Sequence, residues 1–367
     1  MSDEEQDERP DSSVTPELFR QWQSPRFGRS NPERMSNPVW EWLVRSGISA
    51  WSANEHFKGR SAFEAGPGWC FSRFGQSSTQ LPDGRTVLIA GEHEDHYDPD
   101  FYIYNDVVVR DPAGGITIYG YPREAFPPTD FHSGTLVGNR IIIIGSLGYP
   151  DDRRPGDTPV MALDLETFAV SSVVTSGTSP GWIHSHCADL AEDGSSILIR
   201  QGKLDRGIGE PLVENIDDWR LNFSDWRWER LTERQWQRWE VKRKDGKLYH
   251  LREIQMASRT RDLSIHDIFR EEMERLTQAC GQPPDLDLAA VLYRPDLPHE
   301  MLPEVEDEYG VFRIRVDGIV VRYVEEMRSI QMTVEGDLPQ TTIDSLTSDV
   351  LGKMSTLEHA PCALRRL

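Results

Sequence analysis

The sequence is 367 residues long, enough for two domains of ordinary size, and its hydrophobic share of 37% is typical of globular proteins. A formal net charge of −21 disfavours broad electrostatic binding to nucleic acids or anionic membranes. The four cysteines are widely spaced and form no C-x-x-C pair, so we expect reduced thiols in the cytoplasm and no cysteine zinc site.

The N-terminal part divides into a tail and a helical segment. Residues 1–36 are acidic and poor in apolar side chains, which predicts a disordered tail and argues against a signal peptide. In residues 37–65, the apolar side chains of Val39–Val44 recur at helical spacing, and Asn37-Pro38 suits a helix start. We expect this helix to pack on the edge of the β region that follows. No apolar run approaches the roughly 20 residues of a membrane helix, so we expect no membrane association.

Residues 66–255 contain a repeated β-hairpin. Each copy has a short strand, a turn glycine and an apolar strand that ends near a second glycine. The turn glycines Gly84, Gly138 and Gly194 are 54 and 56 residues apart, a regularity that indicates copies of one structural unit. After a variable loop each unit continues into a second hairpin, so that two hairpins make a four-stranded blade. The apolar strands are Val87–Ala90, Ile141–Ile144 and Ile197–Ile199.

The middle and third units repeat one order of residues: a histidine, a turn glycine, an apolar strand, a glycine, a polar residue and an aromatic residue. These are His132, Gly138, Ile141–Ile144, Gly145, Asp164 and Phe168, then His186, Gly194, Ile197–Ile199, Gly202, Asn222 and Trp226. The order resembles the kelch-repeat family over about residues 66–231, although the glycine doublet of the kelch pattern is degraded here. This resemblance implies a mainly β fold of kelch-like β-propeller blades, and a role in protein interaction more often than in catalysis.

Three blades are fewer than the roughly four to eight that propellers commonly need to close a ring. A turn at Asp245-Gly246, between strand-like residues 239–242 and 248–251, predicts a fourth hairpin. Residues 256–367 have a different order of elements, which predicts an α+β C-terminal domain. The expected elements are a helix at 264–279, a hairpin at 311–323, a strand at 330–334 and a helix at 342–357.

The densest polar cluster follows the first apolar strand, where propeller loops build a binding face. Its nitrogen and oxygen ligands suit a divalent cation, which would support a metal-assisted enzyme with His93 and His96 as metal ligands and Glu92 or Glu94 as a base. The alternative is a solvated acidic loop, because no zinc-type spacing is met. The candidate binding residues of this loop are His93, Asp95, His96, Asp98 and Asp100.

Three further histidines, His132, His184 and His186, recur at comparable positions in the repeats, with Asp130 and Asp189 nearby. They can converge on the propeller axis and form a polar binding pocket. The alternative is that these side chains hydrogen-bond to the backbone of the neighbouring blade, since buried polar groups usually have partners.

Tryptophans and basic residues alternate over residues 219–261, a composition typical of single-stranded nucleic-acid sites. Interspersed acidic residues and the net charge make nucleic acid an unexpected partner. No P-loop, G-x-G-x-x-G or H-E-x-x-H motif occurs.

These patterns predict a non-catalytic kelch-like scaffold that binds a protein or a ligand and carries no cofactor. The expected binding face holds the loops His93–Asp100 and Tyr149–Asp157, whose acidic side chains favour a basic protein partner. The alternative function is a metal-assisted enzyme that uses the loop His93–Asp100 and a divalent metal.

Overall fold

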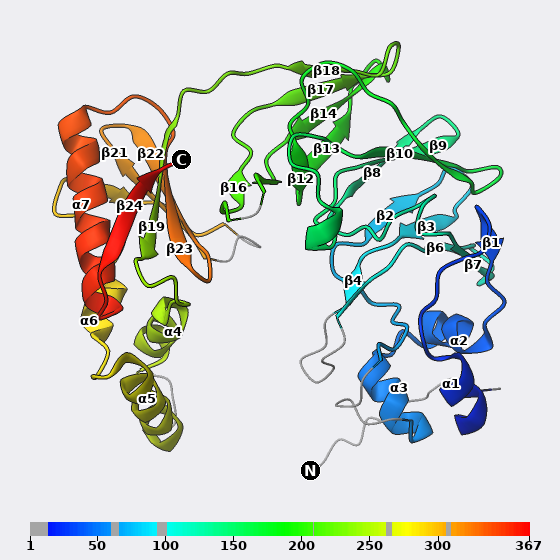
Figure 1. Ribbon diagram of the computed structural model, residues 1–367, viewed down its shortest axis with the longest axis horizontal. Coiled ribbons are helices and arrows are strands. Elements are labelled where there is room, and N and C mark those ends of the chain that lie inside the picture. The colour runs from blue at the N-terminus through cyan, green and yellow to red at the C-terminus, as the bar shows by residue number, and fades with distance from the viewer. Residues whose placement is uncertain (1–13, 60–65, 94–100, 208, 262–265, 306–309) are drawn as a thin grey trace. The chain divides into compact units, whose positions relative to one another are not determined.

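The computed structural model describes residues 14–59, 66–93, 101–207, 209–261, 266–305 and 310–367. The chain divides into two compact units, the first ending at Glu233 and the second beginning at Arg234. Several antiparallel sheets and few helices make up these units, which confirms the predicted mainly β class (Figure 1). Among the described residues, no helix combines the length and apolar character needed to span a membrane.

Three sheets of the first unit follow one up-and-down order, as the two-hairpin repeat predicts (Figure 1). Two of them are four-stranded, and the first gains a short fifth strand, β1 (Glu33–Arg34), beside β7. The strands of the first sheet are β2 (Ser77–Gln80), β3 (Thr86–Ile89), β6 (Val107–Arg110) and β7 (Ile116–Gly120). Those of the second are β8 (Ser133–Val137), β9 (Arg140–Ile144), β10 (Val160–Asp164) and β11 (Val170–Ser172). Those of the third are β13 (Cys187–Leu190), β14 (Ser196–Arg200), β17 (Trp219–Asn222) and β18 (Arg227–Arg230).

Smaller elements lie in the connections of these sheets. A two-stranded sheet pairs β4 with β5 between β3 and β6, and a three-stranded sheet has the order β12-β15-β16. A single 3-10 turn, η1, follows β9. Their bounds are β4 (Glu92–His93), β5 (Tyr102–Ile103), η1 (Pro150–Asp152), β12 (Trp182–His184), β15 (Lys203–Asp205) and β16 (Val213–Glu214).

Two backbone hydrogen bonds join the three sheets just before their first strands. Gly75, Phe131 and Ser185, each two residues before such a strand, all have left-handed φ angles, of 61°, 48° and 52°. The Phe131 N–H donates to the Gly75 carbonyl, and the Ser185 N–H donates to the Phe131 carbonyl, both at 2.8 Å. A Cβ on Gly75 would lie 2.4 Å from the Phe131 nitrogen, so only glycine fits at this contact.

Two apolar cores lie between the three sheets. Strand β9 contributes to both, because Ile141 and Ile143 face the first sheet while Ile142 and Ile144 face the third. All four side chains are at most 2% exposed. A strand buried on both faces is expected to be continuously apolar, which explains the isoleucine run.

The N-terminal helices α1 (Pro16–Trp22), α2 (Pro38–Ser46) and α3 (Ala50–Phe57) cover the other face of the first sheet, where they pack on Val108 and Ile118. Helix α2 confirms the predicted helix, and the Asn37 side chain caps it by accepting hydrogen bonds from two backbone N–H groups.

The predicted disordered tail, residues 1–36, is wrong for its described part. Phe19 of α1 is buried and stacks on Phe57 at 4.7 Å. The Asn31 side chain makes two hydrogen bonds with the backbone of Val170 in β11, at 2.7 and 2.9 Å. Tertiary contacts of a few well-placed residues therefore order a segment whose composition alone favours disorder.

The outward face of the third sheet is polar. Arg200 pairs with Asp189 at 3.0 Å, and Arg220 pairs with Glu229 at 3.1 Å. The described residues of the first unit hold three sheets of this kind and no closed ring of them, so the predicted propeller and its blade number stay predictions.

The second unit is an α+β fold with one six-stranded antiparallel sheet in the order β20-β21-β22-β23-β19-β24. Helices and sheet share one apolar core, and the predicted hairpin, strand and C-terminal helix are all present. The strands are β19 (Gln237–Arg243), β20 (Glu300–Met301), β21 (Val311–Val316), β22 (Ile319–Glu325), β23 (Ser329–Val334) and β24 (Cys362–Arg366). The helices are α4 (Leu251–Thr260), α5 (His266–Cys280), α6 (Leu286–Ala290) and α7 (Gln340–Leu357).

The predicted fourth hairpin around Asp245-Gly246 is wrong. Strand β19 pairs with β23 and β24 of the second unit, and after the turn the chain continues into α4. Trp239 and Val241 of β19 are buried in the core of this unit. The turn is held by the Arg243 guanidinium, which donates to the Asp245 carboxylate at 2.7 and 2.9 Å. The β region that the sequence predicts to extend to residue 255 therefore contributes its last strand to the C-terminal sheet.

Candidate functional site

Of the predicted metal loop, the structure describes only the beginning. His93 ends β4, whereas Asp95, His96, Asp98 and Asp100 lie outside the described residues. Within the described ranges, no group of three or more His, Cys, Asp or Glu side chains is arranged to hold a metal ion. A divalent metal on His93 and His96 therefore stays a prediction.

His93 instead interacts with Cys70, a thiol that the sequence does not mark as special. Burial raises the pKa of Cys70, but its hydrogen bond and charge interaction with His93 bring that pKa below the ordinary value. Cys70 is 1% exposed, and its backbone N–H donates to the Tyr104 hydroxyl at 3.0 Å. The thiol is therefore enclosed in the protein interior, whereas His93 is half-buried.

A buried ion pair lies beside this thiol. Arg73, whose side chain is fully buried, donates to the two carboxylate oxygens of Asp106 at 2.5 and 3.0 Å. The Trp69 indole N–H donates to the same carboxylate at 2.7 Å, and the guanidinium carbon lies 3.5 Å from the centre of the Tyr104 ring. These contacts satisfy both charges and fix the segment before β2 against the start of β6.

His132 and His186 join neighbouring sheets. The His132 Nε2 lies 2.8 Å from the Ser77 Oγ of β2, and the His186 Nε2 lies 2.9 Å from the Ser133 Oγ of β8. Each histidine thus bridges from the start of one sheet to the first strand of the sheet before it. This agrees with the inter-blade alternative, except that the partner is a hydroxyl and not the backbone.

The third histidine has a different setting. His184 lies on β12, where its Nδ1 is 3.1 Å from the Ser185 Oγ. Asp130, which is fully buried, accepts a hydrogen bond from the Gly148 N–H at 2.6 Å, and burial raises the pKa of its carboxyl group. Asp189 lies on the outward face of the third sheet, in its pair with Arg200. His186 interacts electrostatically with both His132 and His184, whereas Asp189 is paired on the outward face of the third sheet. A binding role for His132, His184 and His186 stays a prediction.

His132 and His184 are buried between the packed sheets, and His186 is half-buried. Burial lowers the pKa of His132 to about 3, with a contribution from His186. Burial also lowers the pKa of His184 to about 4, assisted by Lys203 and Arg153, and that of His186 to about 4. They are therefore neutral at pH 7, and a neutral imidazole can either donate a hydrogen bond to a serine hydroxyl or accept one from it.

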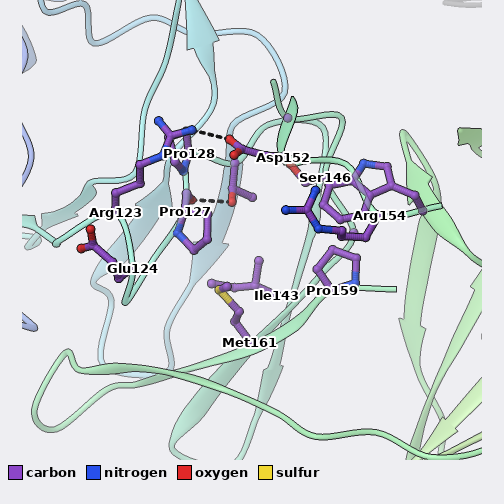
Figure 2. A pocket seen from close by; sticks show the side chains of 14 residues that line it. Arg123, Glu124, Pro127, Pro128, Ile143, Ser146, Asp152, Arg154, Pro159 and Met161 are labelled. Atoms are coloured by element: carbon purple, nitrogen blue, oxygen red, sulfur yellow. Dashed lines mark hydrogen bonds and ion pairs between the residues drawn. The ribbon is translucent and has the colours of Figure 1, made fainter. Parts of the chain in front are cut away.

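A cavity of about 410 Å³ lies in the first unit, at the end of β9 (Figure 2). Its walls come from the connection between β7 and β8, the end of β9, the loop that includes η1, the start of β10 and strand β12. The lining residues are Arg123, Glu124, Pro127, Pro128, Thr129, Ile143, Gly145, Ser146, Gly148, Asp152, Arg154, Pro159, Met161 and Trp182.

The floor of the cavity is apolar and rigid. Ile143 and Met161 are direct neighbours across β9 and β10. Trp182 is buried, and its indole N–H donates to the Leu147 carbonyl at 3.1 Å, so the polar edge of the ring is already occupied. Three prolines restrict the backbone of the walls. A ligand that binds here would order few side chains.

Charged side chains surround the mouth of the cavity. The Arg123 guanidinium pairs with the Asp152 carboxylate at 2.5 Å and lies 5.8 Å from the centre of the Tyr149 ring. Arg154 lies across the cavity from Arg123 and Glu124 (Figure 2). Asp152 and Arg154 come from the loop Tyr149–Asp157, which the sequence predicts as part of a binding face.

No protein-family model matches the sequence, and no curated protein matches it. Among solved structures, the chain is similar to a protein described as YjhT, with 14% identity, a TM-score of 0.32, and coverage of 46% of this chain and 55% of that one. It is also similar to a fungal alcohol oxidase of the AA5 family in complex with copper, with 12% identity, a TM-score of 0.30, and coverage of 45% and 44%. The chain thus spans about half the length of the structures it matches, and TM-scores this low support no argument about fold or function.

Proposed function

We propose that the first unit is a kelch-like propeller module that acts as a non-catalytic scaffold and binds a small ligand in the cavity at the end of β9. Three sheets of equal strand order, tied by equivalent hydrogen bonds, support the module. The cavity itself is the observation that carries the binding function. Its volume of about 410 Å³ falls within the range of small-molecule sites, about 300–1,000 Å³.

The composition of the cavity favours binding over catalysis. The 14 described residues that line it include no histidine, cysteine or lysine. Its two carboxylates, Glu124 and Asp152, are both in the solvent-accessible rim, and Asp152 is already paired with Arg123. General acid–base chemistry usually relies on a buried group, and neither of these carboxylates is buried. An apolar floor with polar groups at the mouth suits recognition.

A fragment screen by ligand-observed NMR tests the proposal. Fragments are expected to bind the wild-type chain and to lose binding in the variant Met161→Trp, whose larger side chain fills the cavity. Met327→Trp is the matched control, because Met327 is 75% exposed in the second unit and lines no part of the cavity. If the fragments that bind do so equally in both variants, the cavity is not the binding site and the proposal fails.

A further inference from the structure

We infer that the cavity selects a small organic monocarboxylate with an apolar body, an inference that rests on the proposed ligand-binding function. The carboxylate head would meet Arg154, and the body would lie on the floor of Ile143 and Met161. Three properties of the described residues lead to this ligand class: the charge balance at the mouth, the chemistry of the floor and the volume.

Arg154 is the cation that the protein leaves available at the mouth. Its Nη1 donates to the carbonyls of Asp151 and Arg153, at 3.1 and 3.0 Å, and within the described ranges it has no ion pair with a carboxylate. A guanidinium has five N–H donors, so most of its hydrogen-bonding capacity remains for a ligand. Arg123, by contrast, is held by Asp152 and lies near the Tyr149 ring. The planar guanidinium of Arg154 can therefore donate two parallel hydrogen bonds to a carboxylate.

The nearby acidic groups limit how much negative charge the ligand can carry. Glu124 lies on the opposite side of the cavity from Arg154 (Figure 2), and Asp152 is a second carboxylate at the mouth. With the chain as a whole at −21, a dianion such as a phosphate monoester would meet more repulsion than one guanidinium offsets. A single negative charge matches Arg154, the one cation without an ion pair among the described residues that line the cavity.

The floor and the volume define the rest of the ligand. Ile143, Met161 and the ring face of Trp182 offer apolar surface and no unused hydrogen-bond donor. A body with hydroxyl or amino groups would lose water there without gaining partners. The volume of about 410 Å³ is near the low end of small-molecule sites, so the body is one ring or a short chain.

Three probes with the same phenyl body and a similar length test this inference on the full chain: 3-phenylpropanoate, 3-phenylpropanamide and 3-phenylpropylammonium, each titrated by ligand-observed NMR. The acid is expected to bind about tenfold more tightly than the amide, because a hydrogen bond to a charged partner is stronger than a neutral one. The ammonium compound is expected to bind most weakly. Raising the salt concentration should reduce the preference for the acid, since the contact is near the surface.

Two variants assign the preference to one side chain. Arg154→Gln is expected to weaken binding of the acid about tenfold and to leave the amide unchanged. Arg110→Gln is the matched control, because Arg110 is an exposed arginine of the same unit that does not line the cavity, and it should change neither.

The outcomes separate this inference from the proposed function. If the amide or the ammonium compound binds as tightly as the acid, or if Arg154→Gln has no effect on the acid, the carboxylate selection is refuted while the binding function stands. If none of the three probes binds, the selection is also refuted, and the fragment screen with Met161→Trp then decides the proposed function.

Discussion

Lowering the pH from 7 to 5 is expected to destabilise the first unit through His132, His184 and His186, of which the first two are buried and the third is half-buried. Their pKa values in the folded chain are about 3 for His132 and about 4 for His184 and His186, compared with about 6.5 in an unfolded chain. Because the folded values are the lower ones, the unfolded chain binds more protons in this interval. The stabilising contribution of the neutral histidines is therefore complete above about pH 6.5 and is lost as the pH falls towards 4.

The magnitude follows from the same values. At pH 5 an unfolded histidine is mostly protonated and each folded one is mostly neutral, a difference of about 2 kcal/mol per residue. Allowing for the small difference already present at pH 7, the three together cost about 5 kcal/mol, which is comparable with the whole stability of many domains. Asp130 acts in the opposite direction, because burial raises the pKa of its carboxyl group in the folded state.

Hydrogen exchange measured by mass spectrometry at pH 7, 6 and 5, after correction for intrinsic exchange rates, gives the opening free energies of β8, β9, β13 and β14. The double variant His132→Gln, His186→Gln isolates the histidine contribution. Gln76 already holds the equivalent position before β2, so glutamine suits the site and does not titrate. In this variant the opening free energy should fall by only about 2 kcal/mol between pH 7 and 5. An unchanged loss would refute the assignment to these side chains.

Further predictions concern the buried ion pair, the backbone contact between sheets at Gly75, and the metal. Replacing Asp106 with alanine leaves a buried guanidinium without its carboxylate and should lower the free energy of unfolding by about 3–5 kcal/mol in urea denaturation; a loss below 1 kcal/mol would contradict that role. Gly75→Ala should destabilise the first unit more than Gly138→Ala in the same assay, because both glycines have left-handed φ angles but only Gly75 has a backbone atom within 2.4 Å of the added Cβ; equal losses would contradict the close approach. Elemental analysis of the purified chain should find no stoichiometric divalent metal; a metal that disappears in the His93→Ala, His96→Ala double variant would favour the enzyme alternative.

The hairpins of the first unit are predictable because their signals are local. A left-handed turn glycine such as Gly138, flanked by an apolar run, specifies two paired strands from a few neighbouring residues. The continuous apolar run Ile141–Ile144 also indicates burial on both faces, as observed. Regular spacing of such hairpins then predicts a series of equivalent sheets.

The fourth hairpin fails because local turn chemistry does not reveal a strand's partner. Asp245-Gly246 is a turn, but β19 before it pairs with strands about 90 and 120 residues further along the chain. Burial of Trp239 and Val241 in the second core decides that pairing. The ordered N-terminal segment is missed for a similar reason. The contacts of one phenylalanine and one asparagine order it, and two residues hardly alter the acidic, polar composition from which disorder is predicted.

The cavity is only partly visible in the sequence. The loop Tyr149–Asp157 is identified as a binding loop, and it supplies Asp152 and Arg154. The floor residues Ile143 and Met161 read as ordinary strand residues, because their exposure depends on which loops lie over the end of the sheet. The bridging role of His132 and His186 likewise depends on the distance between neighbouring sheets, which a repeat pattern does not give.

A crystal structure of the chain soaked with 3-phenylpropanoate tests the central claim most directly. The account predicts ligand density in the cavity at the end of β9, with the phenyl ring on Ile143 and Met161 and the carboxylate within hydrogen-bonding distance of Arg154. A cavity that holds only water while the ligand occupies another surface would contradict it.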